Sequence, residues 1–175
     1  MILLFTGNGK GKTTASLGQM VRVLGRGKSA LMIQFVKGPW KSGEDEFAAT
    51  FGIPRSTFDI RKMGLGFVGI LGDKLPIEKH KEAARAALTA FVKEKKSNKW
   101  HCIVLDEING AAALGLLKKQ DVLAAIKNFP EEKILILTGR DAPQEFIDAA
   151  DLVTEMKEVK HPFQRGKEGG ETVEF

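Results

Sequence analysis

Short apolar runs alternate along the chain with longer stretches in which apolar residues recur every three or four positions. The first kind of segment predicts β-strands and the second predicts amphipathic helices. In the longest helical stretch, the apolar stripe is formed by Ala84, Ala87, Leu88, Phe91 and Val92. Strands are expected at residues 2–6, 29–36, 57–61, 101–106, 133–138 and 152–156, and helices at 12–24, 44–51, 77–96, 120–128 and 143–150.

The expected strands are nearly continuous apolar runs, which is typical of strands that are buried on both faces of a sheet. Strands and helices also alternate along the chain, and this order favours a mostly parallel sheet with helices on both faces. We therefore predict the α/β fold class. No repeat, low-complexity segment or linker divides the sequence, so residues 1–175 are expected to form a single domain.

Two segments interrupt this alternation. Residues 37–45 form a polar, turn-rich stretch directly after the second expected strand, and residues 62–73 are rich in glycine and yet apolar. An apolar glycine-rich loop is unfavourable in water unless something covers it. Either this loop packs onto its own core, or a flat hydrophobic ligand or a second subunit covers it.

The composition is that of a globular protein, with 43% hydrophobic and 28% charged residues among 175. The single cysteine, Cys102, excludes an internal disulfide and lies in an apolar run, where we expect a buried and inert thiol. The chain shows neither a signal-peptide pattern nor an apolar stretch long enough to cross a bilayer. A cytoplasmic protein without a membrane partner is therefore expected.

The formal net charge of +5 changes this picture little. Lysine and arginine are spread along the chain beside aspartate and glutamate, and no nucleic-acid-binding motif is recognisable, so we expect no nucleic-acid partner. A solvated surface with a slight basic excess explains most of the charge. A locally basic pocket for a polyphosphate is the alternative source.

A glycine-rich motif lies between the first expected strand and the first expected helix. Glycines let backbone N–H groups converge on an anion, and the N-terminus of the following helix adds its dipole. In such a P-loop, Lys12 would contact phosphates and the Thr13 hydroxyl would hold a metal ion. Thr6 stands where the usual pattern has its first glycine. The predicted nucleotide-binding residues are Gly7, Asn8, Gly9, Lys10, Gly11, Lys12, Thr13 and Thr14.

A second motif places two acids, Asp106 and Glu107, at the end of an apolar strand. This is the Walker B pattern, whose carboxylate meets Mg²⁺ beside the hydroxyl of the P-loop. We expect Glu107 and Thr13 to bind the metal, Mg²⁺ or Mn²⁺, with Asp106 acting through a water molecule or a neighbour. Arg140 ends another strand and either reaches a phosphate or stays on the surface. Together the motifs predict a P-loop NTPase-like (RecA-like) domain.

These residues resemble the P-loop ATP:corrinoid adenosyltransferases, also called cob(I)alamin or cob(I)yrinic acid a,c-diamide adenosyltransferases. The resemblance covers nearly the whole chain, and the absence of the first P-loop glycine belongs to it. Beyond the P-loop, its marks lie at residues 34–38, 43–44, 63, 66–67, 104–107, 138–140, 150–155 and 160–163. The ordered set is far more specific than a P-loop alone.

The resemblance implies a homodimeric enzyme that binds Mg·ATP and a corrinoid reduced to Co(I), with a flavoprotein-type electron donor as partner. In that family, Co(I) attacks the 5′ carbon of ATP, the 5′-deoxyadenosyl group is transferred and triphosphate leaves. Such a reaction needs aligned substrates and stabilised negative charge, and it needs no general base. The catalytic residues that the resemblance implies are Lys12, Phe67 and Arg140, with residues 63–72 facing the corrin.

The sequence departs from the family pattern at three places. Phe67 matches the first residue of an aromatic pair that, by the resemblance, displaces the lower axial ligand of cobalt, but Gly69 replaces the usual tryptophan. Met1 begins almost on the first strand, where longer members carry an additional segment. The tail at residues 165–170 also differs from the usual basic ending. Trp40 is a further candidate contact for adenine or corrin, or an anchor for a lid.

Other readings remain open from the sequence. A small-molecule or nucleoside kinase would use the same P-loop, but a base for the substrate hydroxyl and an arginine-rich lid are not evident. A non-catalytic ATP-binding regulator of the same fold is the third hypothesis. The histidines share no metal-ligand spacing: His80, on a polar helix face, and His101 are expected to be structural, and His161 is a candidate for the lining of the site.

Overall fold

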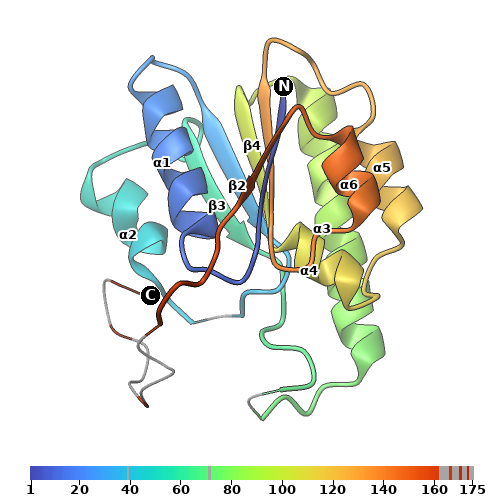
Figure 1. The fold of residues 1–175 in the computed structure, drawn as a ribbon. Helices are drawn as coiled ribbons and strands as arrows, with labels where there is room; N and C mark the ends of the chain where they lie inside the picture. The colour runs from blue at the N-terminus through green and yellow to red at the C-terminus, as the bar shows by residue number, and fades with distance from the viewer. Residues whose placement is uncertain (39, 71, 162–165, 167–169, 171–172, 174–175) are drawn as a thin grey trace.

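The computed structural model describes residues 1–38, 40–70, 72–161, 166, 170 and 173. Figure 1 shows a sheet with helices packed against it, built from alternating strands and helices. The strands are β1 (Ile2–Thr6), β2 (Ala30–Gln34), β3 (Phe58–Lys62), β4 (Cys102–Asp106), β5 (Ile134–Thr138) and β6 (Leu152–Glu155). The helices are α1 (Lys12–Leu24), α2 (Gly43–Thr50), α3 (Ile77–Ser97), α4 (Ile108–Ala113), α5 (Lys119–Ile126) and α6 (Gln144–Ala149).

The six strands form one sheet in the order β3-β2-β4-β5-β1-β6, and each neighbouring pair is parallel. The predicted α/β fold is confirmed, and the described sheet is parallel throughout. All six strands therefore end at the same edge. This carboxyl edge is where open α/β sheets bind their ligands, and it receives the loops that follow Thr6, Gln34, Asp106 and Thr138.

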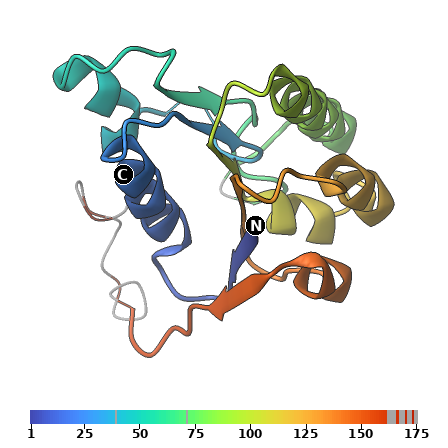
Figure 2. The ribbon, with the colours of Figure 1, turned by 90° about the horizontal axis from the view of Figure 1, so that it is seen from above.

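Helices cover both faces of the sheet (Figure 2), because successive strand residues point to opposite sides. On one face, Met32 and Val104 pack with Met20 of α1. On the other, Leu31 and Leu105 belong to the larger core cluster with the apolar stripe of α3 and with α4, α5 and α6. The strand β2 is buried at every residue, as its continuous apolar sequence predicts.

The single thiol lies within this core. Cys102 has no exposed surface, and burial raises the pKa of its thiol to about 12. The prediction of a buried thiol is confirmed, and a thiol with that pKa is protonated and unreactive at neutral pH. Among the described residues, no helix combines the length and the apolarity that a bilayer crossing requires.

Three details differ from the sequence-based expectation. The strand β6 is exposed along its whole length, because it pairs with β1 at the edge of the described sheet. The short helix α4 was not predicted: Ile108, Ala111 and Ala112 stand at helical spacing and are buried, but six residues are too few to show a helical period in the sequence. His80 does not lie on a polar face: it is 3% exposed, and its Nε2 lies 3.1 Å from Asp73 Oδ2, so it fastens the loop before α3.

Candidate active site

The glycine-rich loop after β1 turns back on itself at Gly7 and Gly11, whose φ angles are 92° and 119°. These values fall in the region that residues with a Cβ rarely adopt. The loop also approaches the end of β6 closely, since the N–H of Gly9 donates to the carbonyl of Met156 at 2.7 Å. A Cβ on Gly9 would lie 2.7 Å from that same carbonyl oxygen, so the position excludes any larger residue.

Lys12 stabilises this loop from within. Its Nζ donates to the carbonyls of Gly7 and Gly9, each at 2.8 Å, and the residue is only 7% exposed. Burial, with a further contribution from Arg140, lowers the pKa of Lys12 against the opposing field of Glu107 and Asp106. The ammonium group is therefore poorly solvated, and an anion placed beside it would gain a strong electrostatic contact.

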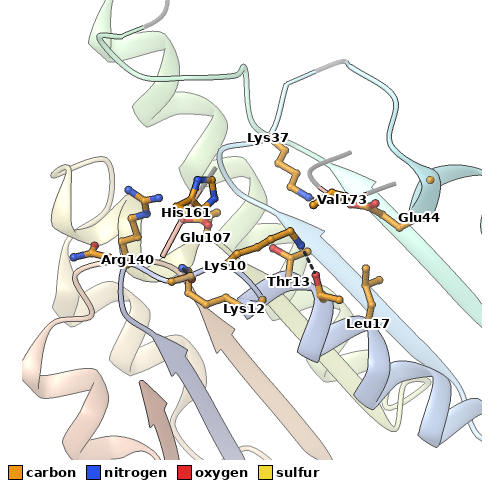
Figure 3. A pocket seen from close by; sticks show the side chains of 15 residues that line it. Lys10, Lys12, Thr13, Leu17, Lys37, Glu44, Glu107, Arg140, His161 and Val173 are labelled. Carbon is orange, nitrogen blue, oxygen red and sulfur yellow. Dashed lines mark hydrogen bonds and ion pairs between the residues drawn. The ribbon is translucent and has the colours of Figure 1, made fainter. Parts of the chain in front are cut away.

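The loop forms the floor of a cavity of about 380 Å³ at the carboxyl edge of the sheet. Figure 3 shows cations from separate elements around it, with Lys10 and Lys12 on the loop, Arg140 after β5 and Lys37 after β2. The lining residues are Asn8, Gly9, Lys10, Gly11, Lys12, Thr13, Thr14, Leu17, Lys37, Gly43, Glu44, Glu107, Arg140, His161 and Val173. A pocket of this charge fits a polyanion.

Asp106 is the hub beneath this cavity. Its Oδ1 accepts hydrogen bonds from the hydroxyls of Thr13 at 2.9 Å and Thr138 at 2.7 Å, and its Oδ2 accepts one from the Gln34 amide at 3.2 Å. The side chain has no exposed surface. Asp106 therefore ties α1, β2 and β5 together, and its oxygens are already engaged by protein donors.

Glu107 is the acid that faces the cavity. It adopts a left-handed conformation with a φ of 63° at the start of α4, and its N–H donates to the Thr138 hydroxyl at 2.9 Å. Burial and then the charge of Asp106 raise its pKa, against the opposing effect of Lys12, Arg140 and Lys37. A carboxylate in this position would be relieved of its desolvation by a bound cation.

The residues present fit a divalent cation that is bound together with a phosphate ligand. The Thr13 hydroxyl gives its proton to Asp106, so its lone pairs stay available, and Glu107 supplies a carboxylate to the same cavity. Among the described residues, no group of three or more histidines, cysteines or acids gathers into a metal site. This donor set suits Mg²⁺, which is held by one or two protein oxygens plus substrate phosphates.

Lys37 is a member of the site that the motifs did not single out. Its Nζ lies 2.9 Å from Glu44 Oε1 and 3.9 Å from Asp106 Oδ2. Burial opposes the charge of Lys37, but Asp106 and Glu44 together outweigh it and raise its pKa. The sequence held two signals for it: its place three residues after the end of a buried strand, and its membership of residues 34–38, which belong to the family resemblance.

The predicted site residues divide into two groups in the structure. Arg140 and His161 line the cavity with the glycine-rich loop and Glu107. Phe67 lies outside it, where its ring packs against Trp40 with the centroids 5.7 Å apart. The tail residues Pro162 and Phe163, which carry part of the family resemblance, lie outside the described residues.

Comparison with known proteins favours one of the hypotheses that the sequence left open. The family model for ATP:corrinoid adenosyltransferase BtuR/CobO/CobP matches residues 1–175, the whole chain. The chain belongs to this family. Membership in this family disfavours the kinase hypothesis, because the family is one of adenosyltransferases and not of phosphoryl transferases.

Curated members of the family are similar to this chain over most of their length. The corrinoid adenosyltransferase CobA of Salmonella typhimurium is 34% identical over 170 residues, which cover 95% of this chain and 81% of that protein. The corrinoid adenosyltransferase of Pseudomonas aeruginosa is 35% identical over 175 residues, covering 100% and 83%. The Escherichia coli K12 enzyme is 32% identical over 166 residues, covering 95% and 81%.

The apolar loop that the resemblance implies to face the corrin packs onto its own core only in part. Met63 and Val68 pack against the larger core cluster. Leu65, Phe67 and Ile70 are 42%, 47% and 60% exposed, respectively. The loop is therefore anchored by part of its side chains and presents the others to solvent, beside the segment that carries Lys37.

Proposed function

We propose that this protein transfers the 5′-deoxyadenosyl group of ATP to the Co(I) centre of a corrinoid and releases triphosphate. Besides family membership, the observation that carries the proposal is the cavity in which Lys12, Lys37 and Arg140 approach one space from three elements. A reaction whose leaving group is an intact triphosphate needs charge stabilisation along that whole group. The cations around the cavity could supply this stabilisation, and their arrangement therefore supports the proposal.

The bond changes balance without a protein base. Co(I) supplies the electron pair of the new Co–C bond, the bond between C5′ and the triphosphate oxygen breaks, and triphosphate leaves with that pair while cobalt becomes formally Co(III). The protein's part is to align the 5′ carbon with cobalt and to stabilise the departing charge. We assign the second task to the P-loop N–H groups, to Lys12 and to Arg140, with Phe67 on the corrin side.

We assign the metal site to Thr13 and Glu107, and Mg²⁺ or Mn²⁺ bound there would neutralise charge on the triphosphate. Lys37 lies opposite Arg140 in Figure 3 and completes the charged wall on the side of α2. We further propose, on the family resemblance, a single-domain cytoplasmic enzyme that acts as a homodimer, with a flavoprotein-type reductant that supplies the electron for reducing the corrinoid to Co(I).

The leaving group tests the proposal. Incubation with Mg·ATP, a corrinoid and a chemical reductant is expected to release triphosphate in equal amount to adenosylated corrinoid. Leaving out the reductant should abolish triphosphate release, because the nucleophile is then absent. ADP as the product would instead identify a kinase or ATPase, and tight ATP binding without any product would identify a regulator.

A further inference from the structure

An exposed aromatic pair lies beside the nucleotide cavity and takes no part in its lining. Trp40 follows Lys37 in the segment after β2, and Phe67 belongs to the apolar loop after β3. Their ring centroids are 5.7 Å apart with a tilt of 35°, and the residues are 61% and 47% exposed. Two large rings in contact with each other and with water present an apolar aromatic surface.

The Trp40 ring is seated in a slot that two glycines provide. A Cβ on Gly38 would lie 2.6 Å from Cζ3 of the Trp40 ring, and a Cβ on Gly66 would lie 2.9 Å from its Cη2. Contacts this short are not tolerated, so any larger residue at either position would displace the indole. The packing against Gly38 and Gly66 thus holds the Trp40 ring in its exposed orientation.

The backbone of Trp40 is fastened as well. Lys62, at the end of β3, donates its Nζ to the Trp40 carbonyl and pairs with Asp45 of α2. In the same segment, Lys37 pairs with Glu44, and both residues line the nucleotide cavity. The segment that forms the wall of the cavity therefore also sets the position of Trp40.

We propose that Trp40 is a substrate-contact residue that, together with Phe67, forms the face on which the corrin macrocycle rests. The inference depends on the proposed function, because that function requires a second, large and flat substrate next to the triphosphate. A pair of rings held in place before binding loses little conformational freedom when a flat ligand covers it. Trp40 thereby supplies an aromatic partner to Phe67 in a chain that has glycine at position 69.

Four variants test this role. Trp40→Ala removes the ring, Trp40→Phe keeps a smaller one, and Gly38→Ala keeps the indole but displaces it from its slot. Phe51→Ala is the matched control, because Phe51 is 68% exposed and its ring packs on Phe47 away from the cavity lining. We measure the Kd for Co(II) cobinamide by equilibrium dialysis, the Kd for Mg·ATP by calorimetry, and the KM and kcat of adenosylation.

Trp40→Ala and Gly38→Ala are expected to raise the corrinoid Kd and KM about tenfold. ATP affinity and the melting temperature should stay unchanged. Trp40→Phe should recover most of the loss, and Phe51→Ala should match the wild type. An unchanged corrinoid Kd in both variants, in a wild type that does adenosylate, would overturn the inference and leave the proposed function intact. A parallel loss of ATP affinity would overturn it too, since Trp40 would then support the cavity wall.

A change of oligomeric state is the remaining outcome. If Trp40→Ala dissociates the protein in sedimentation experiments while the corrinoid Kd stays the same, the aromatic face belongs to a subunit contact and the inference is wrong. If the wild type forms no adenosylated corrinoid at all, the proposed function fails first, and this result is separate from any effect of the variants.

Discussion

The hydroxyl of Thr13 donates a 2.9 Å hydrogen bond to Oδ1 of Asp106, across 93 positions of sequence. This bond joins the start of α1 to the end of β4 and so fixes the position of the glycine-rich loop relative to Asp106 and Glu107. It also determines the roles of those acids. Asp106 accepts hydrogen bonds from protein donors, and Glu107 is therefore the one of these two carboxylates that faces the cavity.

Replacement of Asp106 by asparagine should therefore destabilise the fold itself. The NH2 group that replaces one carboxylate oxygen cannot accept a hydrogen bond, so either the Gln34 amide or the two threonine hydroxyls lose their acceptor. Buried groups left without partners cost about 1–3 kcal/mol each. We expect the free energy of unfolding, from urea titration, to fall by about that amount. Asp148→Asn is the control, because the hydrogen bond that Asp148 accepts from Gln144 is exposed to solvent. Equal stability of both variants would show that the hydrogen bonds of Asp106 do not stabilise the fold.

Lys12→Ala should weaken ATP binding by about 1.5–3 kcal/mol, the value of a hydrogen bond to a charged group. This corresponds to roughly a tenfold to hundredfold rise in Kd, which calorimetry can measure. The variant also loses the two bonds that hold the loop carbonyls of Gly7 and Gly9. Lys119→Ala serves as the control, since Lys119 pairs with Glu145 on the surface. An ATP affinity equal to that of the wild type would exclude the loop as a phosphate site.

Glu107→Gln should change both metal dependence and the pH profile of stability. Because folding raises the pKa of Glu107 above its unfolded value of about 4.3, the folded ligand-free state binds more protons in the window just above that value. The contribution of Glu107 to the free energy of unfolding is fully present below the unfolded pKa and is lost as pH rises through the folded pKa.

In the Gln variant this loss is absent. The ligand-free variant should therefore melt above the wild type at pH 7. The expected difference is about 2–4 °C for each kcal/mol of destabilisation that the ionised Glu107 causes in the wild type. Its ATP binding should also respond less to Mg²⁺. Scanning calorimetry between pH 4 and pH 8, and a Mg²⁺ titration at fixed ATP, check the two effects. Superimposable metal titrations of the variant and the wild type would show that Glu107 does not meet the cation.

Phe67→Ala is expected to lower adenosylation severalfold while leaving the Kd for ATP unchanged, because Phe67 lies outside the nucleotide cavity. By the family resemblance, Gly69 lacks the aromatic group that helps to displace the lower ligand of cobalt. We therefore expect faster turnover of cobinamide, which has no bound lower ligand, than of cobalamin. Initial rates with one fixed reductant, starting from Co(II), measure this preference. Equal rates on the two corrinoids would mean that another residue displaces the ligand.

The glycine-rich loop, the acids after β4 and the parallel sheet were accessible from sequence, because each depends on local pattern. Glycines at fixed spacing before a helix, and apolar runs that end in acids, can each be recognised from a few neighbouring residues. Lys37 lies in a segment that matches the family, residues 34–38, but no local pattern assigned its side chain a role in the site. It becomes part of the site only because β2 and β4 are neighbours, which brings it to 3.9 Å from Asp106.

Long-range packing also explains the expectations that were wrong. The apolar residues of β6 look like those of a central strand, but the strand order places β6 at an edge. His80 stands among charged residues in the sequence and is nevertheless buried, because Asp73 folds back onto its ring. The pairing of Trp40 with Phe67 joins two loops whose contact no periodicity indicates.

The most direct test of the account is the formation of a cobalt–carbon bond. Purified protein is incubated with Mg·ATP and chemically reduced cobinamide, and the absorbance spectrum is followed in the dark and then under light. The account predicts the spectrum of a light-sensitive adenosylated corrinoid, growing in step with triphosphate. A persistent Co(I) spectrum in the presence of bound ATP, or the appearance of ADP in place of triphosphate, would contradict it.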